Sequence, residues 1–323
     1  MLMARRSRLV GVGGFLPERI VTNVELASKL DTSDEWIRTR TGITCRHIAG
    51  PHDTATSMGA AAAARALSYA GLKASDIDAI LVATATPDQA FPATAVRIQA
   101  ELGMTSGFGY DISSACSGFV FALTTADSLI RSHQAQRVLV IGSEVYSRIL
   151  DWSDRGTCVL FGDGAGAVIL SASESDDGRG ILTTHLHSDG QLRDLLYVDG
   201  AVGQPEKSGK LRMSGRDVFR HAVEKLSSSV DEALSSCHLT RENIDWLVPH
   251  QANIRIIERV AKKLSLPADR VVITVDRHAN TSAASIPLAL DEAIRDGRIR
   301  EGELIIMEAL GGGLTWGTVL MRL

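Results

Sequence analysis

Cys116 is the residue with the clearest chemical potential in this chain, because it lies among small residues at the expected start of a helix. The apolar residues after it have helical spacing and predict one buried face: Phe119, Ala122, Leu123, Ala126, Leu129 and Ile130. Unpaired N–H groups at a helix start favour an anion, and the thiolate is the nucleophilic form of cysteine. Ser113, Ser114 and Ser117 are expected to cap this helix. Alone, the pattern fits a small packed side chain as well as a nucleophile.

Two polar residues elsewhere in the chain would complete a site around this cysteine. His250 follows a short apolar stretch, and Asn280 precedes another run of small residues. A Cys/His/Asn set supports hydrolysis, with His as base and Asn orienting it, or acyl transfer in which His and Asn donate hydrogen bonds to a carbonyl oxygen. Glycines 311–313 form an expected tight turn whose N–H groups, together with that of Cys116, offer an oxyanion hole.

The chain repeats itself, and the repeat predicts that these three residues meet. Segments 77–82, 137–142 and 161–170 resemble segments 244–248, 303–308 and 310–320 in the same order. Alternation of helical segments with short Val/Ile/Leu-rich strands predicts an α/β protein whose mixed sheets lie between helix layers. The polar stretch 171–179 marks the boundary, which gives halves of residues 1–174 and 175–323. The pseudo-symmetry of such halves would bring Cys116, His250 and Asn280 to a common centre.

The composition, the net charge and the cysteine spacing limit the class of protein to which this chain can belong. The 323 residues are 45% hydrophobic with a net charge of −4, which suits a large core and argues against nucleic acid as the main partner. The four cysteines lie far apart without a C-x-x-C pair, so neither a zinc site nor disulfides are indicated. No apolar run reaches membrane-spanning length, and no signal peptide precedes the first strand-like segment. We therefore expect a cytoplasmic protein without membrane contact.

Two other motifs argue against competing functions. The glycine-rich segment 162–166 is followed by the strand-like segment 167–170, where a phosphate-binding loop would need a helix. His185 and His187 alternate as ligands on a strand would, but no third ligand at suitable spacing accompanies them. The sequence thus predicts neither a nucleotide-binding loop nor a metal site.

Aromatic and basic residues suggest where larger molecules would bind. Trp36, Arg40 and Arg155 are candidates for holding a nucleotide-bearing substrate, because arginine pairs with phosphates and stacks on flat rings. A cluster of basic residues falls on one expected helix shortly after His250: Arg255, Arg259, Lys262 and Lys263. Both sets are also compatible with ordinary solvated surface. Docking of an acidic partner that carries the substrate is the competing interpretation of the basic helix.

Five motifs together resemble those of the β-ketoacyl-acyl-carrier-protein synthase III family. They are DEWIRTRTGI at 34–43, SACSGF at 114–119, FGDGAG at 161–166, VPHQAN at 248–253 and HANTSAAS at 278–285. The resemblance covers essentially the whole chain. The resemblance implies a thiolase-like fold of two similar halves in five layers, αβαβα, and a homodimer. It implies that Cys116 takes the acetyl group of acetyl-CoA, and that malonyl-acyl carrier protein then loses CO2 and captures this group as acetoacetyl-carrier protein. No permanently bound cofactor is expected.

The resemblance also implies a role for particular residues. Cys116, His250 and Asn280 would be catalytic, and the N–H groups of Cys116 and Gly312 would form the oxyanion hole. The coenzyme A contacts would be Trp36, Arg40, Arg155 and Asn253. The carrier-protein contacts would be Arg220, Arg255, Lys262 and Lys263. The acyl pocket would be lined by Phe161, Leu195, Leu211 and Leu310, with Phe91 supplied by the partner subunit.

Several alternatives bear on substrate and class. Leu310 stands where acetyl-selective family members have Phe, so the length of the starter group is open. A biosynthetic thiolase would need a second cysteine after Cys237, and elongating condensing enzymes carry His where this chain has Asn280. A related synthase of specialised metabolism would keep the same three catalytic residues. A cysteine hydrolase stays open, whereas the intact triad disfavours a non-catalytic carrier-binding scaffold.

Overall fold

The computed structural model describes residues 5–175, 177–200, 206–207 and 209–323, and its core is two mixed sheets. The five-stranded sheet has the order β1 (Arg6–Phe15), β7 (Gly164–Ser173), β6 (Arg137–Glu144), β4 (Ala79–Ala83) and β5 (Phe108–Ile112). The four-stranded sheet has the order β8 (Gly180–Ser188), β13 (Thr315–Arg322), β12 (Leu304–Gly311) and β11 (Trp246–Pro249).

The two sheets share strand order and direction. In the first, β1 and β6 pair antiparallel with β7, and β4 pairs parallel with β6 and β5. In the second, β8 and β12 pair antiparallel with β13, and β11 pairs parallel with β12. A parallel bridge between Leu247 and Val271 stands where the first sheet has β5. The repeat read from the sequence thus corresponds to a repeat of topology.

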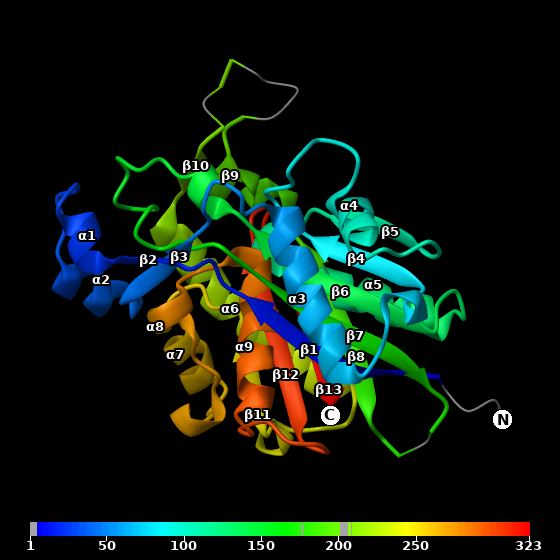
Figure 1. Ribbon diagram of the computed structural model, residues 1–323. Coiled ribbons are helices and arrows are strands. Elements are labelled where there is room, and N and C mark those ends of the chain that lie inside the picture. Colours follow the sequence, from blue (N-terminus) through cyan, green and yellow to red (C-terminus); the bar gives the residue numbers. More distant parts are fainter. Residues whose placement is uncertain (1–4, 176, 201–205, 208) are drawn as a thin grey trace.

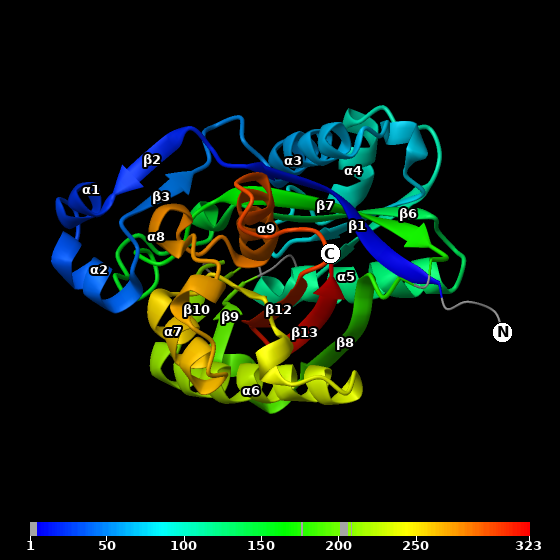
Figure 2. The same ribbon diagram turned by 90° about the horizontal axis from the view of Figure 1, so that it is seen from below.

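Five layers alternate between helices and sheets (Figure 1, Figure 2). Helices α3 (Ala55–Ala70) and α4 (Thr94–Glu101) cover the outer face of the first sheet, and α6 (Gly215–Ser236) and α7 (Ile254–Lys263) lie beyond the second. Between the sheets lie α5 (Gly118–Arg131) and α9 (Ser285–Arg295). Every residue of β4 and β12 is buried, as expected for strands covered on both faces. The expected αβαβα architecture is confirmed.

Smaller elements surround this core. They are β2 (Arg19–Thr22), α1 (Asn23–Ala27), α2 (Asp34–Thr41), β3 (Cys45–Ile48), β9 (Leu196–Val198), β10 (Leu211–Met213) and α8 (Val275–His278). Ser33 is the N-cap of helix α2, and its side chain accepts a hydrogen bond from the Trp36 N–H. Gly42 is the C-cap, and its φ of 77° is one that glycine adopts readily.

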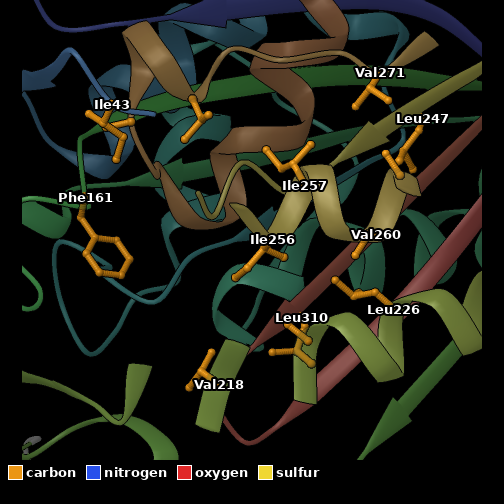
Figure 3. Packing of buried hydrophobic residues seen from close by; sticks show 14 of the residues in the cluster. Ile43, Phe161, Val218, Leu226, Leu247, Ile256, Ile257, Val260, Val271 and Leu310 are labelled. Carbon is orange, nitrogen blue, oxygen red and sulfur yellow. The ribbon is translucent and has the colours of Figure 1, made fainter. Parts of the chain in front are cut away.

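The hydrophobic core is divided by the sheets. The cluster between them includes Phe119 and Leu123 of α5 and Ile286 and Leu290 of α9. A second cluster lies under α3. A third contains residues of α6 and α7 together with Phe161 and Leu310 (Figure 3). Within the described part of the chain, no helix is both long and apolar enough to cross a membrane.

A short 3-10 turn precedes each of the two central helices, and each turn packs closely against a strand. The turn η2 (Ala115–Ser117) leads into α5, and η7 (Ser282–Ala284) leads into α9. A Cβ on Gly311, at the end of β12, would lie 2.8 Å from the Cys116 nitrogen. A Cβ on Gly142 of β6 would overlap the carbonyl oxygen of Ala283. Glycine at both strand ends therefore allows the helix starts to approach.

Replacing Gly142 with alanine should destabilise the protein by about 1–3 kcal/mol, because the added methyl group forces η7 away from β6. Urea unfolding followed by circular dichroism measures this change. Gly190→Ala is the matched control, since a Cβ there meets nothing within 4 Å. Equal stability of the two variants would show that the contact at Gly142 is not tight in solution.

Candidate active site

The predicted catalytic residues converge on the segment 281–285 at the start of α9. The Ser282 side chain hydrogen-bonds the Cys116 thiol, and the Ser282 N–H donates to Asn280 Oδ1 over 2.9 Å. Ser285 Oγ lies 2.7 Å from His250 Nδ1. The exposed fractions of Cys116, His250 and Asn280 are only 4, 6 and 5%. The structure thus brings all three side chains to one site that is nearly closed to bulk water.

Burial, rather than the helix start, dominates the resting state of Cys116. It raises the pKa of the Cys116 thiol to about 11, although hydrogen bonds with Ser282 and Tyr146 lower that pKa. The resting residue is therefore a thiol, which corrects the expectation that the helix start alone would favour a thiolate. The expected capping by Ser114 and Ser117 was also wrong, because neither side chain accepts a capping hydrogen bond. Ser117 Oγ donates instead to the Ser114 carbonyl oxygen.

The position of His250 is fixed by its own backbone hydrogen bond to β12 and by the side-chain hydrogen bonds of the next residue, Gln251. The backbone N–H of His250 donates to the Glu308 carbonyl oxygen over 2.8 Å, at the end of β11. The next residue, Gln251, is fully buried; its amide donates to Pro249 and Val272 and accepts from the N–H groups of Thr274 and Val275. Both N–H donors and both lone pairs of this side-chain amide are used, so the His250 loop is fixed to the segment before α8. Burial lowers the pKa of His250 to about 3, which keeps the imidazole neutral near pH 7.

Asn280 is oriented by its backbone and by its amide oxygen. Its N–H donates to the Leu160 carbonyl oxygen, and its own carbonyl oxygen accepts from Gly162 N–H. Because Ser282 N–H can only donate, Asn280 Oδ1 must face it. The amide NH2 group is then the face of the side chain directed away from Ser282, with Ala252 O 3.5 Å from Nδ2. Asn280 thus offers a donor.

A buried carboxyl behind the cysteine was not identified from the sequence. Glu144, at the end of β6, lies 3.0 Å from Ser282 Oγ, and burial raises the pKa of its carboxyl to about 7. Tyr146 Oη is also 3.0 Å from Ser282 Oγ, and its ring stacks on Phe161 at 4.9 Å. The only sequence signal was an acidic residue at the end of an otherwise apolar strand.

Three of the four residues expected to bind coenzyme A, Trp36, Arg40 and Arg155, lie together. The guanidinium carbons of Arg40 and Arg155 are 4.5 and 5.4 Å from the centre of the Trp36 ring. Arg155 also bonds Asp31 through its backbone and carboxylate oxygens. Asn253 has a local role that was not predicted, since its side chain caps α7 by accepting from Ile256 N–H at 3.1 Å.

The expected acyl-pocket residues fall into two places. Phe161, Leu211 and Leu310 are buried in the cluster that also contains residues of α6, and Leu195 packs against it. Figure 3 shows Leu310 in this cluster with Val218 and Leu226 of α6. Phe91 is 84% exposed in the single chain and is not a member of this cluster.

The basic residues lie on exposed faces of two helices. Arg255, Arg259, Lys262 and Lys263 of α7 are exposed, as is Arg220 of α6. Arg255 Cζ lies 5.9 Å from the Phe219 ring centre, which connects the two helices, and Arg220 pairs with Asp217.

The two strand histidines bind a carboxylate. His185 Nδ1 and His187 Nε2 lie 3.2 and 2.7 Å from the two oxygens of Glu232 on α6. They therefore connect β8 to α6. In the ranges that the structure describes, no group of three or more His, Cys, Asp or Glu side chains is arranged to hold a metal ion.

Comparisons with known proteins agree with this geometry. A family profile described as 3-oxoacyl-[acyl-carrier-protein (ACP)] synthase III matches residues 110–190, and its C-terminal counterpart matches residues 234–323. The β-ketoacyl-[acyl-carrier-protein] synthase III of Acidiphilium cryptum is 64% identical over 98% of this chain and 99% of the relative. The enzyme of that name from Granulibacter bethesdensis is 60% identical over 99% of this chain and 100% of the relative.

A solved structure extends the likeness to three dimensions. The crystal structure of 3-oxoacyl-[acyl-carrier-protein] synthase III from Aquifex aeolicus matches with a TM-score of 0.94 at 46% identity, over 98% of this chain and 100% of that one. A buried cysteine that meets His and Asn between two similar α/β halves defines an acyltransferase of the thiolase-like fold. Within that class, the chain belongs to the β-ketoacyl-acyl-carrier-protein synthase III family.

Proposed function

We propose that this protein catalyses the initiating condensation of fatty acid synthesis. Cys116 accepts the acetyl group of acetyl-CoA, and malonyl-acyl carrier protein then decarboxylates and attacks the acetyl-enzyme. The products are acetoacetyl-acyl carrier protein, CO2 and coenzyme A. The observation that carries the proposal is the convergence of Cys116, His250 and Asn280 on the segment 281–285, with all three nearly excluded from water.

Decarboxylation needs a hydrogen-bond donor at the developing enolate oxygen. We infer that the Ser285 hydroxyl donates to His250 Nδ1, which lies 2.7 Å away. The imidazole hydrogen is then on Nε2, so a neutral His250 can donate. Asn280 Nδ2 supplies the second donor. For the acylation step, the N–H groups of Cys116 and Gly312 would bind the oxyanion of the tetrahedral intermediate. The close approach of Gly311 to the Cys116 nitrogen supports this arrangement.

The remaining residues would bind substrates. Trp36 and Arg155, with Arg40, would hold the adenine and phosphates of coenzyme A, and Asn253 would contact its pantetheine arm. The exposed residues Arg220, Arg255, Lys262 and Lys263 would dock an acidic acyl carrier protein by charge complementarity.

Dimerisation would complete the starter pocket. A phenylalanine that is 84% exposed in the single chain is costly in water, and insertion into a partner subunit would bury Phe91 beside Phe161, Leu195, Leu211 and Leu310. We infer acetyl as the main starter. The two halves, residues 1–174 and 175–323, would act as one unit in the cytoplasm.

Intact-protein mass spectrometry tests the proposed reaction. The protein is incubated separately with acetyl-CoA, butyryl-CoA and octanoyl-CoA, and malonyl-acyl carrier protein is then added. We expect an acetyl adduct at Cys116 that is cleared with formation of a ketoacyl-carrier product. Release of free acetate at the same rate without carrier protein would instead establish a hydrolase. An adduct cleared only by another acceptor would indicate a synthase of specialised metabolism.

Trp36→Ala should raise the KM for acetyl-CoA about tenfold or more, since stacking of a base on an aromatic ring is worth about 1–3 kcal/mol. The value of kcat should change little, because Trp36 lies outside the reacting centre. Initial rates at varied acetyl-CoA measure both constants. Alkylation of Cys116 by iodoacetamide is the control and should be unaffected; an unchanged KM would remove Trp36 from the coenzyme A site.

A further inference from the structure

The fully buried carboxyl of Glu144 lies behind Cys116, and its two oxygens have different hydrogen-bond partners. Glu144 Oε2 accepts from the Thr84 and Thr86 hydroxyls, at 3.3 and 2.7 Å, and from Ala85 N–H at 3.0 Å. Oε1 faces Ser282 Oγ at 3.0 Å. The carboxyl is therefore anchored through Oε2, while Oε1 points toward the cysteine side of the site.

Ser282 connects this carboxyl to the thiol. A hydroxyl carries one hydrogen, and an ionised carboxylate can only accept, so Ser282 donates to Glu144 Oε1. The lone pairs of Ser282 Oγ are then free to accept from the Cys116 thiol. Once the thiolate has formed, the Ser282 hydroxyl can donate to it, and this hydrogen bond lowers the pKa of Cys116. The Tyr146 hydroxyl, 3.0 Å from Ser282 Oγ, is a second partner of the same thiol.

The resting thiol needs a proton acceptor, and two candidates are close. Burial raises the pKa of Cys116 to about 11 and that of Glu144 to about 7, whereas it lowers the pKa of His250 to about 3. Glu144 is thus the stronger base of the two. It is also the one joined to Cys116 through a hydroxyl.

We propose that Glu144 is the proton acceptor for Cys116 during acylation, with the Ser282 hydroxyl as the bridge between them. The S–H bond of Cys116 breaks as a new O–H bond forms on Ser282, and the original Ser282 proton moves to Glu144 Oε1. The thiolate attacks the thioester carbon of the acyl-CoA, and coenzyme A leaves as a thiolate that takes a proton from solvent. When condensation expels the Cys116 thiolate, the proton returns by the same path.

The transfer also removes a like charge from beside the new thiolate. The negative charge of Glu144 raises the pKa of Cys116, so a protonated Glu144 lets the thiolate form more easily. The titratable groups whose pKa values the charge of Glu144 raises include Cys116 of η2 and Tyr146 of η3 (Tyr146–Arg148). The end of β4 and η7 contribute hydroxyl and N–H groups.

The test is the pH profile of Cys116 alkylation by iodoacetamide, followed on the Cys116 peptide by mass spectrometry between pH 5 and 11. This deepens the proposed function and rests on it only for the role of Cys116 as nucleophile. Because no acyl-CoA is used, a failure here leaves the acetylation experiment to decide the function separately. The variants are Glu144→Gln and Ser282→Ala. Alanine suits the positive φ of Ser282, 51°, because Ala115 adopts 45° in η2.

For the wild type we expect two rises in rate, one with the ionisation of Glu144 near pH 7 and one with direct ionisation of the thiol. Both variants should lose the lower rise, with a fall of about 10²-fold or more at pH 7.5, as is typical of general-base catalysis. Asp127→Asn is the matched control, since Asp127 is a buried carboxyl with a raised pKa at the far end of α5. It should keep both rises.

A different profile would overturn the proposal. If Glu144 acted only through its charge, the wild type would show a single rise, and Glu144→Gln would move it to lower pH and react faster at pH 7.5. Retention of the lower rise in Ser282→Ala would exclude the hydroxyl as bridge. Thermal melts establish that each variant is folded. Should the Glu144 variant not fold, Ser282→Ala alone decides the question.

Discussion

Cys116→Ser should lose acyl transfer from acetyl-CoA by about 10⁴-fold or more, the scale seen when a catalytic nucleophile is removed. A serine hydroxyl is a far weaker acid than a thiol, and the buried thiol already has a pKa raised to about 11. Even if Glu144 accepts a proton through Ser282, it is too weak a base to convert a serine at position 116 to an alkoxide in a site with so little water. Intact-mass measurement after incubation with acetyl-CoA should show no adduct.

Cys158→Ser is the matched control for this loss. Cys158 is also buried, and burial raises the pKa of its thiol to about 11 as well, but it lies outside the catalytic set. This variant should still be acetylated, after a thermal melt has shown that it is folded. An acetyl adduct on Cys116→Ser, or loss of the adduct in Cys158→Ser, would assign the nucleophile elsewhere.

Asn280→Ala should separate the two half-reactions. Decarboxylation should fall by about 10²- to 10³-fold, because one of two donors to the enolate oxygen is removed. Acylation by acetyl-CoA should stay within a few fold of wild type, since the oxyanion hole of that step uses backbone N–H groups. The backbone of residue 280 is held by Leu160 and Gly162, so the side chain can be removed without releasing the loop.

Single-turnover experiments measure the two rates apart. The variant is first acetylated, and CO2 release is then followed after addition of malonyl-acyl carrier protein. His250→Ala is the companion variant, since it removes the other donor and should show the same pattern. Equal loss of acylation and decarboxylation in Asn280→Ala would refute the division of roles.

The fold could be predicted, and candidate catalytic residues could be named, because many of their signals are local. Helix and strand patterns repeat every few residues, and the second half of the chain repeats the order of the first, so the duplicated α/β architecture follows from the sequence. A reactive residue type at a predicted helix start or strand end is also a local feature. Such local features singled out Cys116, His250 and Asn280, and the repeat together with the family motifs then grouped them as one proposed catalytic set.

The sequence could not predict the properties that depend on several distant segments at once. Glu144, Tyr146 and Ser282 meet only because η7 packs against the end of β6, and nothing near any one of them in sequence indicates the contact. The two guanidinium groups at Trp36 come from α2 and from a distant loop; the sequence named these residues as one binding set, but only the structure shows both groups against the Trp36 ring.

The sequence of this protein determined its class and its repeat, and it named the three residues proposed as catalytic. The tertiary structure alone decided that Cys116 rests as a thiol, that His250 stays neutral and that Glu144 takes protons near pH 7. The reason is that a charge in the interior feels every surrounding group and the loss of water, and this desolvation is a collective property of the packed layers rather than of any stretch of chain.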